Sequence, residues 1–209
     1  EMLEACTGYM NEHKIYMLQQ IRECNKKLQE RIDELDKRIK AIMEPYSWMV
    51  EKLCEIPGIQ DRVCEDLIAE IGLDMGNFPT SAHLCSWAGM CPGNNESAGK
   101  KKSGRTSHGD KHVRTVLVEA AWAASRTKGT FFMERFKRLA LRRGTKKALI
   151  AVGHSLLTCV YRVLTGESYK ELGELYMASK TEIRRRDYLK AELAKLGYNV
   201  TLTKKDKKD

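Results

Sequence analysis

A long run of apolar residues at heptad spacing constrains the fold of this chain more than any other feature. Between residues 9 and 43 the apolar positions recur at alternating intervals of three and four, over more than three heptads. This is the a/d pattern of a coiled coil. A helix over the segment would be about 50 Å long at roughly 1.5 Å per residue, and it could not bury its seam alone. The seam consists of Leu18, Ile21, Asn25, Leu28, Ile32, Leu35, Ile39 and Ile42.

The sequence leaves two ways in which this seam can be buried. Asn25 falls at an a position, where a buried amide is best satisfied by its twin across a parallel dimer. We therefore predict a homo-oligomer formed through the coiled coil, either a dimer or a tetramer. The alternative is an intramolecular helical hairpin with Asn25 near its open end. Pro45 is expected to end the helix.

The rest of the chain predicts further helices and no clear strand. Asp110 is a candidate N-cap for a helix that runs to about Arg126. Gly144 should separate an amphipathic helix at 131–142 from the most apolar segment, 146–165, which we expect to be the central core helix. The predicted fold class is all-α, with a long N-terminal helix followed by a compact helical domain. Predicted divisions are a coiled-coil segment (1–47), a helical domain (48–178), and a charged helix with a frayed tail (179–209).

The turn at 56–59 (Ile-Pro-Gly-Ile) lies between two amphipathic segments and resembles a helix-hairpin-helix motif. In that motif the glycine lets backbone N–H groups approach a phosphate. However, residues 60–74 are acidic, which weakens a direct role in nucleic-acid binding. A purely structural turn and a phosphate clamp both remain open.

Composition narrows the class of protein. The chain has 42% hydrophobic and 31% charged residues, as expected of a folded protein rather than a disordered one. Its seven cysteines are scattered and include no C-x-x-C pair, which disfavours a disulfide framework or zinc ribbon and favours a reducing cytoplasm. The apolar segment near 149–157 is interrupted by Gly153 and His154, so we predict no membrane partner.

Positive charge is concentrated in one third of the chain. The net charge is +9, yet residues 97–166 hold 16 Lys or Arg against 3 Asp or Glu. This asymmetry favours a polyanion as partner. The glycine-rich loop at 93–110 carries much of it, and we predict that this loop and the residues just after it bind nucleic acid. The predicted contacts are Lys100, Lys101, Lys102, Ser103, Arg105, Thr106, Ser107, His108, Lys111 and Arg114.

Two other chemistries for this loop do not fit its residues. A nucleotide-binding P-loop would need four residues between Gly93 and the next glycine, but there are five, and Lys101 stands where a hydroxyl is required. His108 and His112 have the spacing of a zinc-protease pair, but Gly109 replaces the glutamate and Lys111 would repel a metal. We therefore predict no metal site and no cofactor within this chain.

The hydroxyls beside these cations allow a further reaction. A serine can attack a phosphodiester if its proton is removed and if cations neutralise the charge that builds on phosphorus. Ser97 lies within a few residues of Lys100, Lys101, Lys102 and Arg105. Most serines in such loops only hydrogen-bond phosphates, so the chemistry alone leaves both roles open.

Five stretches of the sequence form one set of motifs: positions 56–59, Phe78, 84–92, Ser97 and 104–107. Together they resemble the C-terminal domain of the insertion-sequence 110 family of transposases, the DEDD type related to the pilin-inversion recombinase. The similarity covers about residues 50–176, and its departures are modest: Ala98 follows Ser97 where the family has glycine, and His108 stands where lysine is usual.

This resemblance implies a specific activity. Family members are bridge-RNA-guided DNA recombinases in which a RuvC-like domain with four acidic residues precedes a coiled coil and then this domain. The serine at position 97 is the implied nucleophile, and the implied Mg²⁺ belongs to the RuvC-like domain. We thus expect a C-terminal part of a transposase, inactive by itself, with DNA and a structured guide RNA as partners. The alternatives are a non-catalytic module whose loop only grips phosphates, and a dimerisation device.

Overall fold

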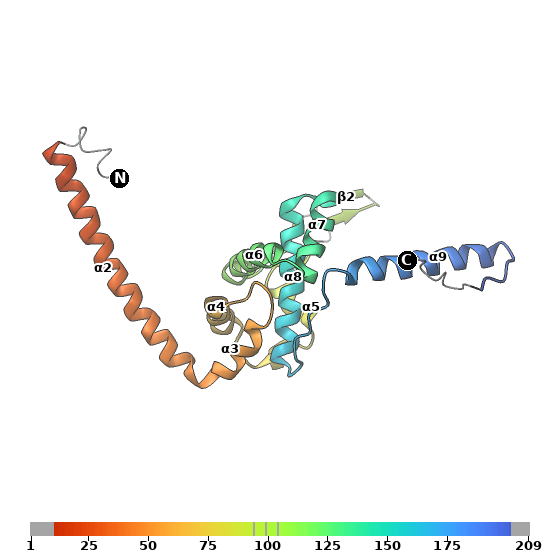
Figure 1. Cartoon of the computed structure of the whole chain (residues 1–209), viewed down its shortest axis with the longest axis horizontal. Helices are drawn as coiled ribbons and strands as arrows, with labels where there is room; N and C mark the ends of the chain where they lie inside the picture. The colour runs from red at the N-terminus through yellow and green to blue at the C-terminus, as the bar shows by residue number, and fades with distance from the viewer. Residues whose placement is uncertain (1–10, 94, 99, 104, 202–209) are drawn as a thin grey trace, which may run out of the picture. The chain divides into compact units, whose positions relative to one another are not determined.

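The part of the chain that the structure describes is helical apart from one short hairpin. The computed structural model describes residues 11–93, 95–98, 100–103 and 105–201 (Figure 1). These residues divide into two compact units, with the boundary between Trp48 and Met49. The predicted architecture, a long N-terminal helix followed by a compact helical domain, is confirmed.

The first unit is dominated by one continuous helix, α2 (Glu12–Met43). Its N-cap is Asn11, whose side chain accepts a hydrogen bond from the backbone N–H of Lys14 at 2.9 Å. Pro45 lies in the 3-10 turn that follows (Glu44–Tyr46), so the predicted end of the helix is confirmed. No residue of α2 is buried. The predicted seam is exposed along its length, from 39% at Leu18 to 61% at Ile42, apart from half-buried Ile39. Residues 11–48 therefore do not form the intramolecular hairpin.

The second unit contains the remaining helices. They are α3 (Ser47–Cys54, which begins in the first unit), α4 (Asp61–Ile71), a 3-10 turn (Met75–Asn77), α5 (Ser81–Trp87), α6 (Lys111–Arg126), α7 (Phe131–Arg143), α8 (Thr145–Leu164) and α9 (Tyr176–Lys195). The break expected at Gly144 is present, since this glycine separates α7 from α8, and Gly72 follows α4. The charged C-terminal helix begins at Tyr176, slightly before the predicted boundary at 178.

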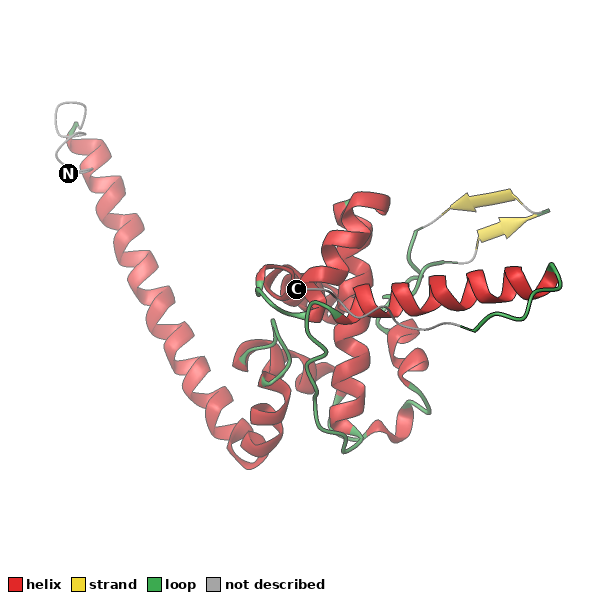
Figure 2. Cartoon of the chain, turned by 45° about the vertical axis from the view of Figure 1, so that its right-hand side comes forward, coloured by secondary structure: helices red, strands yellow, loops and turns green. Residues whose placement is uncertain are grey.

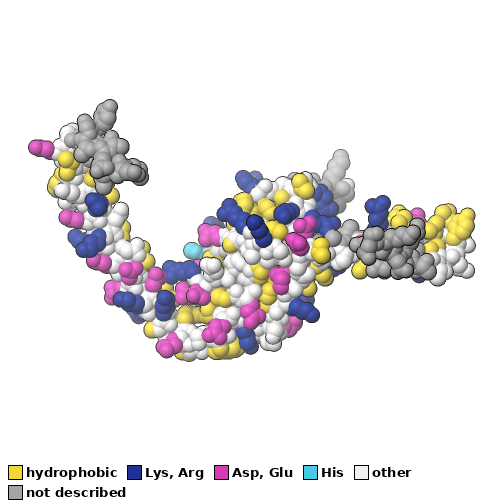
Figure 3. Space-filling view, viewed as in Figure 1, with side chains coloured by type: hydrophobic (Ala, Val, Ile, Leu, Met, Phe, Trp, Pro, Cys, Tyr) yellow, Lys and Arg dark blue, Asp and Glu magenta, His cyan; other side chains and the backbone are white. Residues whose placement is uncertain are grey.

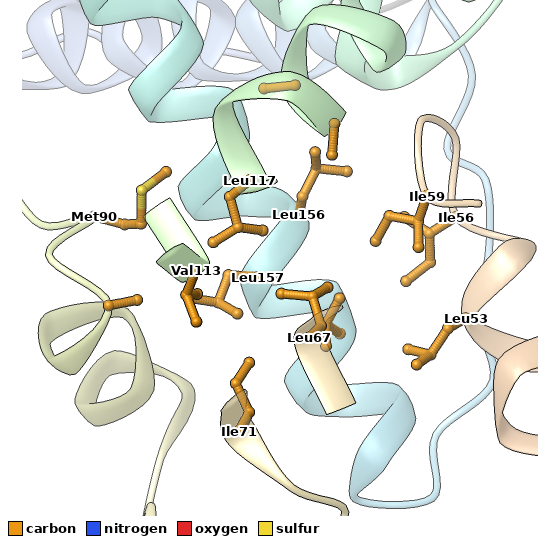
Figure 4. Close-up of a cluster of buried hydrophobic side chains, with 14 of the residues drawn as sticks. Leu53, Ile56, Ile59, Leu67, Ile71, Met90, Val113, Leu117, Leu156 and Leu157 are labelled. Atoms are coloured by element: carbon orange, nitrogen blue, oxygen red, sulfur yellow. The ribbon is translucent and has the colours of Figure 1, made fainter. Parts of the chain in front are cut away.

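Helix α8 is the central core helix, as predicted. It packs against α5, α6 and α7. Figure 4 shows Leu156 and Leu157 of α8 among side chains from α3, α4 and α6. Its length and apolar composition would also suit a membrane span, but its apolar side is covered by the other helices. The buried residues of α8 are Ala148, Leu149, Val152, Gly153, Leu156, Leu157, Val160 and Val163.

The turn at 56–59 is packed into this core. Ile56 and Ile59 are 0% and 2% exposed, and the backbone N–H of Ile59 donates to the carbonyl of Ile56 at 3.0 Å. Gly58 has a φ of +87°, and a Cβ at this position would meet the backbone of α6 at Ala120 and Ala124. The missing side chain thus allows close packing against α6. This contact favours the structural interpretation of the turn over the phosphate clamp.

A two-stranded hairpin lies within the basic loop, where the sequence indicated no strand. Figure 2 shows strands β1 (Asn95–Ser97) and β2 (Lys100–Ser103) projecting from the helices. They pair antiparallel, with Asn95 opposite Ser103 and Ser97 opposite Lys100. These strands are short and polar, so they lack the apolar alternation by which strands are recognised. The expectation of a loop without strands is corrected here.

His154 makes the stability of the helical unit sensitive to acid. Burial lowers the pKa of its imidazole, and the nearby Arg135 guanidinium lowers it further. The folded state then binds the proton less readily than the unfolded state, so protonation favours unfolding. Stability should be full above the unfolded pKa of about 6.5 and decrease as the pH falls below it. We expect the melting temperature of wild type to drop more than that of His154→Gln between pH 7.5 and 5.5, measured by circular dichroism. Equal drops would contradict this.

Candidate nucleic-acid interface

The basic loop is fixed at its base by backbone contacts between its two ends. Pro92 and Thr106 form an antiparallel bridge. Beside them, the N–H of Gly93 donates to the carbonyl of Arg105 at 2.7 Å, and that of Ser107 donates to Cys91 at 3.2 Å. A Cβ on Gly93 would lie 2.6 Å from the Arg105 oxygen, so glycine permits this approach. The hairpin therefore extends from a paired base.

The C-terminal end of the loop, at Asp110, is attached to two helices. The backbone N–H of Asp110 donates to the carbonyl of Trp87 in α5 at 3.1 Å. Its carboxylate accepts a hydrogen bond from the N–H of Val113 at 2.8 Å and caps α6. The predicted N-cap is confirmed, and α6 ends at Arg126 as expected. These contacts fix the direction in which the loop leaves the core.

Ser97 occupies the last position of β1, farthest from the paired base. It lies opposite Lys100, the first residue of β2. The next residue, Ala98, has a φ of +51°, in the left-handed region that disfavours residues with a Cβ. Ala98 stands where the resembled family has glycine, and this φ gives a physical reason for glycine there. The side chains of residues 95–97 and 100–103 lie outside the described part of the structure, as do Gly99 and Gly104 altogether.

The other predicted contacts differ in exposure. Arg105, His108 and Lys111 are exposed, whereas Arg114, Thr106 and Ser107 are half-buried. The hydroxyl of Ser107 is enclosed and has no hydrogen-bond partner among the described residues. In this conformation it does not face solvent. The described residues contain no group of three or more His, Cys, Asp or Glu suited to a metal ion.

Four further cations were not singled out from the sequence. We call them the α7–α8 corner: Arg142 and Arg143 end α7, while Lys146 and Lys147 lie in the first turn of α8. Gly144 and Thr145 separate the two pairs. All four side chains are exposed, and Figure 3 shows Lys and Arg gathered over this end of the helical unit. The excess of positive charge in residues 97–166 includes these four cations, but the sequence predicted nucleic-acid binding only for the loop at 93–110 and the residues just after it.

Comparison with known proteins relates this helical unit to DNA-rearranging proteins. Residues 50–137 match the family model described as Transposase IS116/IS110/IS902 family. The chain is 30% identical over 139 residues to the pilin gene-inverting protein of Moraxella lacunata, which is 64% of this chain and 43% of that protein. It is 33% identical over 115 residues to the pilin gene-inverting protein of Moraxella bovis, which is 54% of this chain and 35% of that protein.

These matches confirm the predicted resemblance to this transposase family over residues 50–137, a span that includes the Pro57–Gly58 turn, the hairpin and α6. The matched region spans about two fifths of the Moraxella lacunata protein and about a third of the Moraxella bovis protein.

Proposed function

We propose that this chain is the C-terminal part of a transposase or DNA recombinase, in which Ser97 attacks a DNA phosphodiester. The observation that carries the proposal is the position of Ser97. It ends β1 at the far end of a hairpin with a paired base, next to a run of three lysines. The family match over 50–137 and the similarity to pilin gene-inverting proteins support DNA rearrangement as the overall reaction.

The proposed step is a transesterification. The Ser97 hydroxyl oxygen forms a bond to phosphorus while the bond from phosphorus to one sugar oxygen breaks. The serine proton passes to a base, and the departing sugar oxygen takes up a proton to become a free hydroxyl. Lys100, Lys102, Arg105 and Arg114 would neutralise the charge on the phosphate. Because one phosphodiester bond is exchanged for another, the free hydroxyl of a second strand can reverse the step without ATP.

The remaining part of the site is proposed to come from an acidic RuvC-like domain of the same longer protein. The described residues of this chain offer no cluster of metal ligands, so the carboxylates of that domain would hold Mg²⁺. Bound there, the ion would stabilise charge on the phosphate oxygens. The proposed partners are the two DNA segments to be exchanged and a structured guide RNA.

A covalent intermediate is the direct test of this function. The longer protein, with its flanking RNA, would be incubated with a DNA duplex nicked near the exchange site, so that the cleaved end diffuses away and the adduct persists. A protein–DNA species that resists denaturant, and whose DNA-linked peptide contains Ser97, supports the proposal. Efficient strand exchange without such an adduct would show that the loop binds phosphates but does not supply the nucleophile.

The exposed seam of α2 predicts a homodimer. Apolar side chains that remain 39–61% exposed along a helix of 32 residues need a partner. We expect the chain to sediment as a dimer, and Ile32→Lys to weaken the dimer by at least about tenfold because it buries an unpaired charge. Gln19→Lys, at an outward b position, should leave the dimer intact. Analytical ultracentrifugation measures both, and a monomeric wild type would contradict the prediction.

A further inference from the structure

The α7–α8 corner carries an unusual density of unpaired charge. Four of its six consecutive residues, 142–147, are cationic. Within the described part of the chain, none of the four takes part in an ion pair. Residues 131–147 contain seven Lys or Arg and one acidic residue, Glu134. The corner is therefore a concentrated positive surface without internal compensation.

The position of two of these charges is unfavourable for the fold itself. Arg142 and Arg143 suit the C-terminal end of α7, where the helix dipole favours cations. Lys146 and Lys147 lie in the first turn of α8, where the same dipole favours anions, and that turn contains no acidic residue. The stability of the fold does not explain why two lysines lie at the start of α8, whereas binding of an anionic partner would.

The surroundings indicate an extended anion rather than a small one. Every residue from 141 to 147 is exposed, including Leu141 at 92%. The corner forms one end of the helical unit, and Figures 1 and 2 show the hairpin toward that same end. An exposed helix–helix corner with cations on both sides of Gly144 can contact successive phosphates of a nucleic-acid backbone.

We propose that the α7–α8 corner is a second nucleic-acid contact, separate from the hairpin, which binds the phosphate backbone of duplex DNA. It positions the duplex without reading its sequence, because its cations are suited to phosphates rather than base edges. The choice of DNA rests on the proposed function. The contact itself rests on the charge and exposure of Arg142, Arg143, Lys146 and Lys147.

The test compares two double variants that each remove two positive charges. Lys146→Ala/Lys147→Ala removes them from the corner. Lys128→Ala/Arg162→Ala removes them from exposed positions before α7 and near the end of α8. Fluorescence anisotropy with a labelled duplex of about 20 base pairs measures the affinity of the 209-residue chain at several salt concentrations. Loss of two phosphate contacts should weaken binding about tenfold or more and reduce the salt slope by roughly 1.8. The control should change affinity by less than about threefold.

Two further measurements exclude a folding defect. The corner variant should melt at the same temperature as wild type or higher, since it removes cations from the start of α8. Leu141→Lys adds a cation at an exposed position beside the corner and should tighten DNA binding. Equal loss in both double variants would overturn the proposal, because it would report only net charge. A loss confined to an RNA hairpin of matched sequence, with duplex DNA binding unchanged, would also overturn it.

The result is independent of the nucleophile. If the corner variant loses DNA affinity while the longer protein forms no serine adduct, the proposed reaction fails and the corner stands. If the adduct forms and the corner variant binds DNA normally, the proposed reaction stands and the proposed corner contact fails.

Discussion

Ser97→Ala should abolish both the covalent protein–DNA adduct and strand exchange in the longer recombinase, while DNA binding by the chain is retained. The proposed bond is made by the Ser97 hydroxyl, and alanine offers no atom to replace it. A nucleophile that forms the covalent intermediate typically accounts for several orders of magnitude in rate, so we expect a loss of at least about a thousandfold. Adduct formation on the nicked duplex, followed on denaturing gels, measures the loss.

The matched control is Ser103→Ala. Ser103 lies in the same hairpin, but it pairs with Asn95 near the base, whereas Ser97 pairs with Lys100 at the other end. If the hydroxyls of the hairpin only hydrogen-bond phosphates, the two variants should lose similar DNA affinity. Each should then lose strand exchange only to the extent that it loses DNA binding. If Ser97 is the nucleophile, only its replacement removes the adduct. Normal recombination by Ser97→Ala would end the catalytic interpretation.

Ala98→Gly tests the geometry next to the nucleophile. Ala98 has a φ of +51°, which costs a residue with a Cβ about 1–2 kcal/mol. Glycine adopts this φ without strain and should leave adduct formation equal to wild type or faster. Ala98→Val should slow it, because a β-branched residue tolerates positive φ poorly. Equal rates for the two variants would show that this backbone conformation is not needed for the reaction.

The helices were predictable because their signals are local. Pro45 and Gly144 each end or separate helices at the positions that their backbone chemistry dictates. Asp110 caps α6 as its sequence position indicated. The central place of α8 followed from its apolar composition alone. These features depend on residues within a few positions of one another, so a single sequence contains them.

The hairpin and the α7–α8 corner could not be placed by the same reasoning. The strands are three and four residues long, and their polar composition is that of a loop. The bridge between Pro92 and Thr106 that supports them joins residues 14 positions apart, a relation that no local pattern encodes. The corner cations were visible as charge, but helix ends separated by one glycine had to be known before they could be grouped.

The turn at 56–59 shows how a motif with two interpretations is decided by packing. Its sequence fits either a phosphate clamp or a structural turn. The structure places Ile56 and Ile59 in the core and Gly58 against α6. A backbone packed this closely against a helix is occupied by that contact. The turn therefore positions α4 against α6, the helix that follows the basic loop, and its effect on function should act through stability.

Gly58→Ala should accordingly be among the most destabilising single substitutions in the helical unit. An added Cβ would lie 2.7 Å from the backbone nitrogen of Ala124 and 2.8 Å from its Cβ, and it would also meet the carbonyl oxygen of Ala120. These atoms belong to α6 and cannot move without shifting the helix. The positive φ of +87° adds a further cost. We expect a loss of at least about 3 kcal/mol in the free energy of unfolding, measured by urea denaturation.

Gly129→Ala separates the steric cost from the backbone cost. Gly129 also has a positive φ, +75°, but a Cβ there would meet no atom within 4 Å. Its replacement should cost only about 1–2 kcal/mol, the penalty for placing alanine in the left-handed region. The difference between the two variants then measures how closely the turn approaches α6. If Gly58→Ala costs no more than Gly129→Ala, the turn is not packed against that helix, and its backbone is free to bind a phosphate after all.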